Sequence, residues 1–351
     1  MQRIGVLAKM SMNTKRRELL GKSTKAAALA GVSSCAGAVL AQAQNTATNA
    51  SSTKSMRILV GFPPGGGTDV IARMLAERLR DELGQPILVE NRPGAGGQLA
   101  AQALKASSPD GTTMFISHDH TITILPLVMK NPGFNPERDF VPVSGFASFV
   151  NAFAISATAP VDNFAAYLKW VQTQSDKKER GSVGIPAPAS TLEFLVGVMR
   201  ARYNLDIVAA PYRGSAPMIA DMLGHQIPAG MGSVPDFIEH HKAGKLRVLA
   251  VLGGKRQAAL PEVPTFAELG LKGLEDMPFY GFFAVAGTPR ASIERFSGAL
   301  AKVLRQPQVA NQLSQMGLTV EHMTAEQLGK RERAYAQVWA DIVRESGFKP
   351  Q

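Results

Sequence analysis

Two glycine-rich turns have the composition of an anion-binding site. The first, residues 62–69 (FPPGGGTD), follows an apolar run and precedes a stretch with the apolar spacing of a helix. The second, residues 90–101 (ENRPGAGGQLAA), repeats this arrangement one strand later. Backbone N–H groups at a helix start point the same way, the helix dipole adds to them, and small residues let a ligand approach the backbone. The pattern predicts capture of a phosphate or a carboxylate, although a single turn of this kind could serve only to reverse the chain.

The spacing of these glycines disfavours a nucleotide as the ligand. A Walker A loop carries a lysine and then Ser or Thr after its second glycine, and no lysine follows Gly66. A dinucleotide loop has the spacing Gly-x-Gly-x-x-Gly, whereas Gly65-x-Gly67 leads to Val70 at the last position. Because a carboxylate satisfies the same backbone N–H groups, it is the favoured ligand class.

Other residue patterns give little sign of catalysis or of a metal. His118 and His120, in the segment SHDHT, are spaced to project to one side of an extended chain, but no third metal ligand is evident. We interpret them as loop or pocket-rim histidines, with His118 a candidate for the ligand pocket. Neither a Gly-x-Ser-x-Gly nor a His-Glu-x-x-His motif occurs, and no catalytic residue or cofactor is predicted. A triad assembled from distant residues remains an alternative.

The elements that position these residues alternate between strand and helix from Met56 onward. This order predicts an α/β fold with parallel strands, so that both glycine turns lie at the carboxyl ends of adjacent strands. Two such units are expected: domain I, residues 56–153 plus 283–351, and domain II, residues 154–282. Two chain crossings between them would form a hinge, with the ligand site in the cleft.

The first 55 residues have the features of an export leader. A basic segment, a mildly apolar run and Ala-Gln-Ala predict a signal peptide over residues 1–43, followed by a disordered linker over residues 44–55. The pair Arg16 and Arg17 is typical of a twin-arginine signal, with an ordinary signal peptide as the alternative. Lipoprotein anchoring at Cys35 is a minor alternative. The expected location is the periplasm, and no later stretch is long and apolar enough for a transmembrane segment.

The charge of the chain is concentrated in this leader. The formal net charge is +10, but residues 1–44 hold seven of the 38 Lys and Arg residues and one of the 28 Asp and Glu residues. The remainder has a net charge of +4 and no basic run interleaved with aromatic residues. Nucleic-acid binding is therefore disfavoured.

The two turns, in this order and spacing, resemble a known family. GFPPGGGTDVIARMLAERL followed by PILVENRPGAGGQLAA is similar to the Bug family of extracytoplasmic solute receptors, the binding components of tripartite tricarboxylate transporters. The similarity continues through DFVPVSGF, APYRGSAPMIADMLGHQI, KAGKLRVLAV, LPEVPTFAELG and GFFAVAGTP, over essentially all of the mature chain. It implies a two-domain periplasmic-binding-protein (Venus flytrap) fold with a hinged interdomain cleft. The implied function is binding of a small carboxylate without catalysis, the glycine turns cradling the carboxylate.

The resemblance transfers to individual residues. Those that match the family pattern are Phe62, Pro63, Gly66, Thr68 and Asp69 in the first turn and Asn91, Ala95 and Gly96 in the second. In domain II the family usually has Gly-x-Gly-Ser-x-x-His-Leu, whereas residues 187–194 read APASTLEF. Ser190 is kept and is also a good helix N-cap, but both glycines are alanine and Glu193 replaces the histidine. Further domain II candidates are Thr191 and Ser233, while Arg213 could face either the cleft or the solvent.

These observations favour a periplasmic solute receptor for a di- or tricarboxylate, an acidic amino acid or an aromatic acid. The expected partners are membrane transporter subunits, which are separate chains, and the receptor itself is expected to be a monomer. One alternative is a secreted hydrolase or isomerase that acts on a carboxylate. Another is the ligand module of a sensory system.

Overall fold

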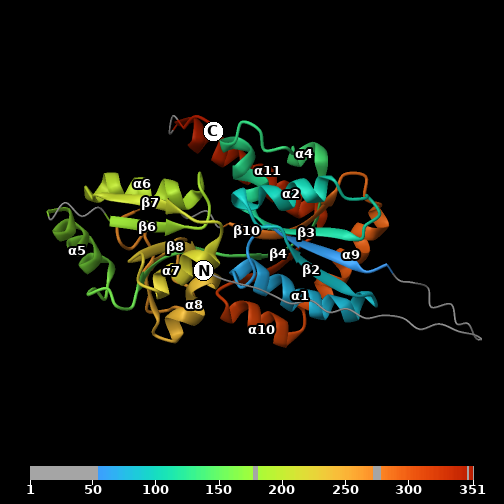
Figure 1. The fold of residues 1–351 in the computed structure, drawn as a ribbon. Coiled ribbons are helices and arrows are strands. Elements are labelled where there is room, and N and C mark those ends of the chain that lie inside the picture. The colour runs from blue at the N-terminus through green and yellow to red at the C-terminus, as the bar shows by residue number, and fades with distance from the viewer. Residues whose placement is uncertain (1–53, 177–180, 272–277, 346–347, 351) are drawn as a thin grey trace, which may run out of the picture. The chain divides into compact units, whose positions relative to one another are not determined.

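The strands belong to two separate β-sheets (Figure 1). The structure is a computed structural model that describes residues 54–176, 181–271, 278–345 and 348–350, all within one compact unit, Ser52–Gln351. The predicted signal peptide (residues 1–43) and residues 44–53 of the predicted linker lie outside these ranges. Both sheets have helices packed on them, as the alternating sequence pattern predicts.

The first sheet has the order β11-β4-β10-β3-β1-β2. β1 pairs in parallel with β2 and β3, while β10 is antiparallel to β3 and β4, and β11 to β4. The strands are β1 (Met56–Val60), β2 (Ile87–Asn91), β3 (Thr113–His118), β4 (Phe140–Ser148), β10 (Phe279–Val285) and β11 (Thr319–Met323). The glycine turns follow β1 and β2, and the histidine segment follows β3. All three therefore lie at the carboxyl ends of these parallel strands, where α/β proteins bind ligands.

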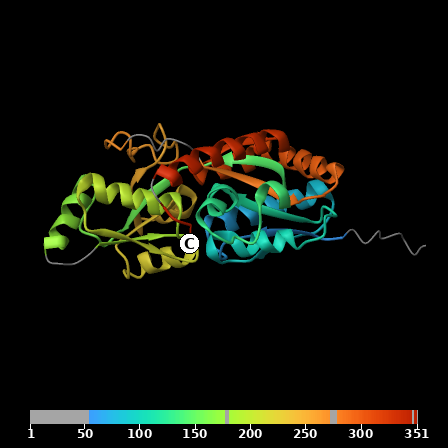
Figure 2. The same ribbon diagram turned by 90° about the horizontal axis from the view of Figure 1, so that it is seen from above.

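The helices that accompany this sheet come from both ends of the described chain. They are α1 (Gly67–Leu83), the 3-10 turn η1 (Ala95–Gly97), α2 (Gln98–Lys105), the π-helical turn η2 (His120–Ile124), α3 (Leu125–Val128), α4 (Pro136–Asp139), α9 (Arg290–Leu304), α10 (Pro307–Gln315) and α11 (Ala325–Glu345). α11, red in Figure 2, packs on β4 and η2. None of the helices in the described ranges combines the length and apolar character needed to cross a bilayer.

The second sheet has the order β7-β6-β8-β5-β9. β6 is parallel to β7 and β8, and β5 is antiparallel to β8 and β9. Its strands are β5 (Asn151–Ser156), β6 (Gly181–Ile185), β7 (Ile207–Pro211), β8 (Ala229–Ser233) and β9 (Leu246–Val251). Its helices are α5 (Phe164–Asp176), α6 (Thr191–Tyr203), α7 (Ser215–Leu223) and α8 (Val234–Lys242).

Alternating side chains of the strands fill a separate apolar core on each face of a sheet. In β1, Ile58 and Val60 pack in a cluster with α1 and α9, whereas Leu59 packs on the other face with α2 and α11. In β5, Phe153 faces α5 and α6, whereas Ala152 faces α7 and α8. A fully buried Leu, Ile or Phe side chain contributes about 1.5–3 kcal/mol. These cores fix the strand ends that carry the polar residues described below.

The chain passes between the sheets at two places. β4 ends at Ser148 in the first sheet and β5 begins at Asn151 in the second. The chain returns between Val251, the end of β9, and Phe279, the start of β10. The domain boundaries expected from the sequence, after residues 153 and 282, fall inside β5 and β10. We propose that domain I and domain II correspond to the two sheets, with their boundaries in the connecting segments.

Candidate ligand-binding site

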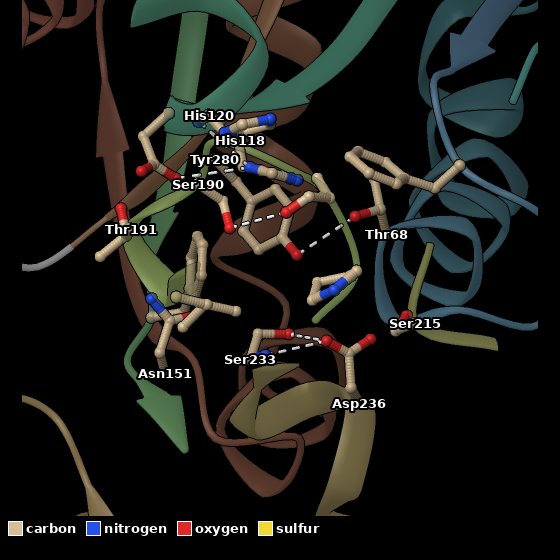
Figure 3. A pocket seen from close by; sticks show the side chains of 16 residues that line it. Thr68, His118, His120, Asn151, Ser190, Thr191, Ser215, Ser233, Asp236 and Tyr280 are labelled. Carbon is tan, nitrogen blue, oxygen red and sulfur yellow. Dashed lines mark hydrogen bonds and ion pairs between the residues drawn. The ribbon is translucent and has the colours of Figure 1, made fainter. Parts of the chain in front are cut away.

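A cavity of about 60 Å³ lies between elements of the two sheets (Figure 3). Thr68 and Tyr280 reach it from the first sheet's elements, and Ser190 and Ser233 from the second's. At ~10–15 Å³ for each enclosed water, this space holds roughly four to six waters, or a compact organic acid. The wall consists of Phe62, Thr68, His118, Asp119, His120, Phe149, Asn151, Pro186, Ala187, Ser190, Thr191, Leu192, Ser215, Ser233, Asp236 and Tyr280.

Four helices begin at this cavity. Thr68 lies in the first turn of α1, Thr191 and Ser215 open α6 and α7, and Ser233 is the N-cap of α8. The first N–H groups of a helix have no partner within it, and they form the positive end of its dipole. Among the described residues that line the cavity, none is a lysine or an arginine. The wall therefore attracts an anion through backbone N–H and hydroxyl groups rather than through cationic side chains.

The Asp236 carboxylate already accepts hydrogen bonds from backbone N–H groups at two of these helix starts. Its Oδ2 accepts hydrogen bonds from the Ser233 N–H (2.9 Å) and hydroxyl (2.6 Å), which completes the capping box of α8. Its Oδ1 accepts from the Gly67 N–H at the start of α1, at 3.0 Å. Since α1 accompanies the first sheet and α8 the second, this carboxylate links the two. The starts of α6 and α7 remain for a ligand.

The start of α6 lacks the usual cap. Ser190 occupies the N-cap position and is 5% exposed, but its hydroxyl donates to the Ala187 carbonyl at 2.8 Å instead of accepting from the first turn. The Glu193 carboxylate, which could have capped the helix, accepts the Ala189 N–H at 2.6 Å. A helix start that faces a cavity without a side-chain cap needs another acceptor. A ligand carboxylate would meet that need.

Aromatic rings form the wall on the side of the first sheet. The His118 ring stacks on Phe62 at a centroid distance of 4.9 Å and meets Phe149 and Tyr280 edge-on at 6.0 and 5.8 Å. The Tyr280 hydroxyl hydrogen-bonds Thr68 Oγ1 at 3.3 Å, and burial raises the pKa of this phenol (Figure 3). The flat rings suit the apolar body of an organic acid, and the hydroxyls can hydrogen-bond its polar groups.

His120 is the buried polar side chain without partners at this site. It is 5% exposed, and neither ring nitrogen has a hydrogen-bond partner within the described residues. Burial is the main reason that its pKa is lowered to about 4; the charge of His118 acts in the same direction and that of Asp119 opposes it. The ring is therefore neutral at pH 7. No group of three His, Cys, Asp or Glu side chains in the described ranges is arranged to hold a metal ion.

The second glycine turn makes room for the His120 ring. Gly96 has a φ of +65°, and a Cβ there would lie 2.6 Å from His120 Nε2. Gly97 has a φ of +95°, and a Cβ there would lie 2.4 Å from Thr121 Oγ1. The Thr121 hydroxyl donates to the Gly96 carbonyl at 2.7 Å. The turn thus packs against the start of η2 and holds His120 at the cavity.

In the first turn, Asp69 braces the backbone. Its carboxylate accepts the Gly65 N–H at 2.9 Å, pairs with Arg73 and accepts from Asn91 Nδ2 at 2.8 Å. Asn91 Nδ2 also lies 3.0 Å from the Phe62 carbonyl, to which it donates. Burial raises the pKa of Asp69, but these hydrogen bonds and the Arg73 charge outweigh it, so the pKa is lowered overall. The network fixes the turn that presents Phe62 and Thr68.

The residues expected at the site fall into two groups. Those on the cavity wall are Phe62, Thr68, His118, Ser190, Thr191 and Ser233. Those that do not line it are Pro63, Gly66, Asp69, Asn91, Ala95 and Gly96. Pro63 packs closely on Gly214, and Ser215 packs closely on Gly66. A Cβ added to Gly214 or to Gly66 would lie within 3 Å of that neighbour. Arg213 is exposed and does not line the cavity. The ligand-binding roles remain predictions.

Several wall residues were not foreseen from the sequence, notably Asp119, Ser215, Asp236 and Tyr280. His120 was expected only as a loop or pocket-rim histidine. A local signal existed for Asp236, since Ser-Val-Pro-Asp at residues 233–236 has an N-cap serine, an early proline and an acid at the third helical position. Tyr280 has no such signal, because its place depends on β10 pairing with β3.

Comparison with known proteins identifies the family. Residues 71–348 match the model of the tripartite tricarboxylate transporter family receptor. BugT of Bordetella pertussis is 31% identical over 297 residues, which cover 84% of this chain and 90% of BugT. These matches confirm the resemblance to the Bug family.

Solved structures give the same result for the fold. The periplasmic binding protein BugD is 27% identical, with a TM-score of 0.79 over 85% of this chain and 99% of BugD. Rpa4515 of R. palustris, solved with adipate, is 27% identical, with a TM-score of 0.79 over 85% of this chain and 98% of its own. The two-domain periplasmic-binding-protein fold is confirmed. The chain belongs to the family of tripartite tricarboxylate transporter receptors.

Proposed function

We propose that this protein is a periplasmic receptor that captures one small carboxylate in the cavity and delivers it to separate membrane subunits of a tripartite tricarboxylate-type transporter. The observation that carries this proposal is the start of α6, where the buried Ser190 does not cap the helix and where the described lining of the cavity has no lysine or arginine. Rpa4515 bound to adipate supports a carboxylate as the ligand class.

We expect the ligand carboxylate to bind at the starts of α6 and α7, whose first residues are Thr191 and Ser215. A hydrogen bond to a charged group contributes about 1.5–3 kcal/mol, so two or three such N–H contacts contribute about 3–9 kcal/mol. Micromolar binding, at ~8 kcal/mol, lies near the upper end of this range. The rings of Phe62 and His118 cover the body of the acid. These groups bind the ligand without activating it, so no reaction is expected.

Because Thr68, Ser190 and Ser233 are each less than one-tenth exposed, the two sheets must separate for a ligand to enter. We expect the hinge in the segments that connect β4 with β5 and β9 with β10. Opening breaks the hydrogen bond between the Gly67 N–H and Asp236. Ligand binding then favours the closed arrangement through contacts with both sides.

The experiment is isothermal titration of the mature chain with acetate, succinate, adipate, citrate, benzoate and aspartate. The proposal predicts saturable one-to-one binding of at least one acid and an increase in melting temperature with its concentration. NMR of the ligand after prolonged incubation should show no product. Product formation would favour the hydrolase or isomerase alternative, and failure of every acid to bind would refute the proposal.

The periplasmic location depends on the leader, for which we retain the twin-arginine proposal. Replacing Arg16 and Arg17 together with lysine should block export if the signal is of this type. The measurement is the amount of mature protein in the periplasmic fraction. A normal amount would point to the general secretory route.

A further inference from the structure

Asp119 is a carboxylate at the cavity with unused hydrogen-bonding capacity. It is 4% exposed, and the one side-chain contact described for it is with His118 Nδ1 at 3.4 Å. The other carboxylate of the wall, Asp236, accepts three hydrogen bonds from the chain itself. A carboxylate has about four acceptor sites. Asp119 can therefore accept further hydrogen bonds from a ligand.

His120 independently points to a ligand at the same place. It adjoins Asp119 in the sequence, lines the cavity and is 5% exposed, with neither ring nitrogen partnered. A neutral imidazole has one acceptor nitrogen and one N–H donor, and leaving both buried and unpaired is unfavourable. A ligand that donates a hydrogen bond would satisfy the acceptor nitrogen.

The charges around the cavity determine which donor fits. Two carboxylates line it, and the described lining includes no lysine or arginine. The side chain of Arg331, whose charge acts on Asp119, lies over the Phe279 ring at 5.3 Å and outside the wall. A ligand with a second carboxylate near Asp119 would be repelled there. A ligand with a positive group would be attracted.

We propose that Asp119 and His120 form a subsite for the ammonium group of the ligand, so that the acid captured in this cavity is an amino acid. The inference rests on the proposed function, which supplies the carboxylate site at α6 and α7. The ammonium group donates to the Asp119 carboxylate and to the acceptor nitrogen of His120. One cavity thus offers a partner for each of the two charges of a zwitterion.

Two series of acids that differ only at the second carbon test this assignment: propionate, lactate and alanine, and succinate, malate and aspartate. Calorimetric titration of wild-type protein should show the amino acid binding about ten- to a hundredfold more tightly than the plain acid in any series that binds. Equal affinities, or a hydroxy acid that binds more tightly than the amino acid, would overturn the assignment. If neither series binds while adipate, citrate or benzoate does, the amino-acid assignment fails and the proposed function stands; failure of all of these acids refutes both.

A variant identifies the residue responsible. Asp119→Asn keeps the shape of the side chain and removes its charge, so the preference for the amino acid should fall at least tenfold while the plain acid binds no more weakly. Asp110→Asn, which removes the same charge at an exposed position, should leave the preference unchanged. If Asp119→Asn folds, as judged by its circular dichroism spectrum, and retains the full preference, Asp119 does not hold the ammonium group.

Discussion

The buried, neutral His120 should make stability depend on pH in a window set by its shifted pKa. In the unfolded chain its pKa is about 6.5, whereas in the folded protein it is about 4. Between these values the unfolded chain binds more protons, so the free energy of unfolding must decrease as the pH falls. The contribution is fully present above pH 6.5 and is lost progressively down to about pH 4.

The size of the effect follows from the shift. At ~1.4 kcal/mol for each pKa unit, the full loss is on the order of 3 kcal/mol, of which about 2 kcal/mol is lost by pH 5. Because His120 is only 5% exposed, solvent screens this effect little. His322, whose pKa is also lowered by burial, acts in the same direction, so a reference variant is needed to isolate His120.

His120→Leu provides that reference. Urea unfolding of both proteins at pH 8, 7, 6 and 5, without ligand, gives the difference in unfolding free energy at each pH. At pH 8 the leucine variant should be at least as stable as wild-type protein, because the ring has no hydrogen bonds to lose and its two unpaired nitrogens are removed. The difference in unfolding free energy should shift by about 2 kcal/mol in favour of the leucine variant by pH 5. A difference that stays constant with pH would refute the assignment of His120 as a buried neutral base.

The remaining predictions concern backbone geometry and the link between the sheets. Gly96→Ala should lower the free energy of unfolding by at least ~2 kcal/mol, about twice the effect of Gly65→Ala. Both glycines have a positive φ, but only at Gly96 would the new Cβ have atoms within 4 Å. Equal effects of the two substitutions in urea unfolding would contradict this. Asp236→Ala should cost about 2 kcal/mol and Ser233→Ala about 1, because only the first also removes the bond to the Gly67 N–H. Equal losses would show that this bond contributes nothing.

Local patterns were sufficient to predict much of the fold. The run Met56–Val60 and the helical spacing after it correspond to β1 and α1, and the glycine-rich turn at residues 62–69 contributes Phe62 and Thr68 to the cavity wall. The strand Thr319–Met323 was not predicted, because it is a half-exposed edge strand whose pattern is short and polar.

The role of the second glycine turn could not be predicted from its composition. Its glycines were expected to cradle the ligand, whereas Gly96 and Gly97 make room for His120 and Thr121. Those partners lie more than twenty positions later, on a segment whose π-helical turn has no clear sequence signal. In domain II, the substitutions in APASTLEF revealed a departure from the family pattern, but not that Ser190 and Glu193 would hydrogen-bond elsewhere and leave α6 uncapped.

The central claim is that backbone N–H groups at the start of α6 bind a carboxylate. Thr191→Pro removes the first of these N–H groups at a helical position where proline is well tolerated, and the preceding Ser190 already has an extended backbone with a ψ of 165°. Thr191→Ala removes the side chain and keeps the N–H group. Titrated with the acid that binds wild-type protein most tightly, the proline variant should lose about 1.5–3 kcal/mol of binding free energy and the alanine variant ~1 kcal/mol or less. Equal affinities of the two folded variants would contradict the account.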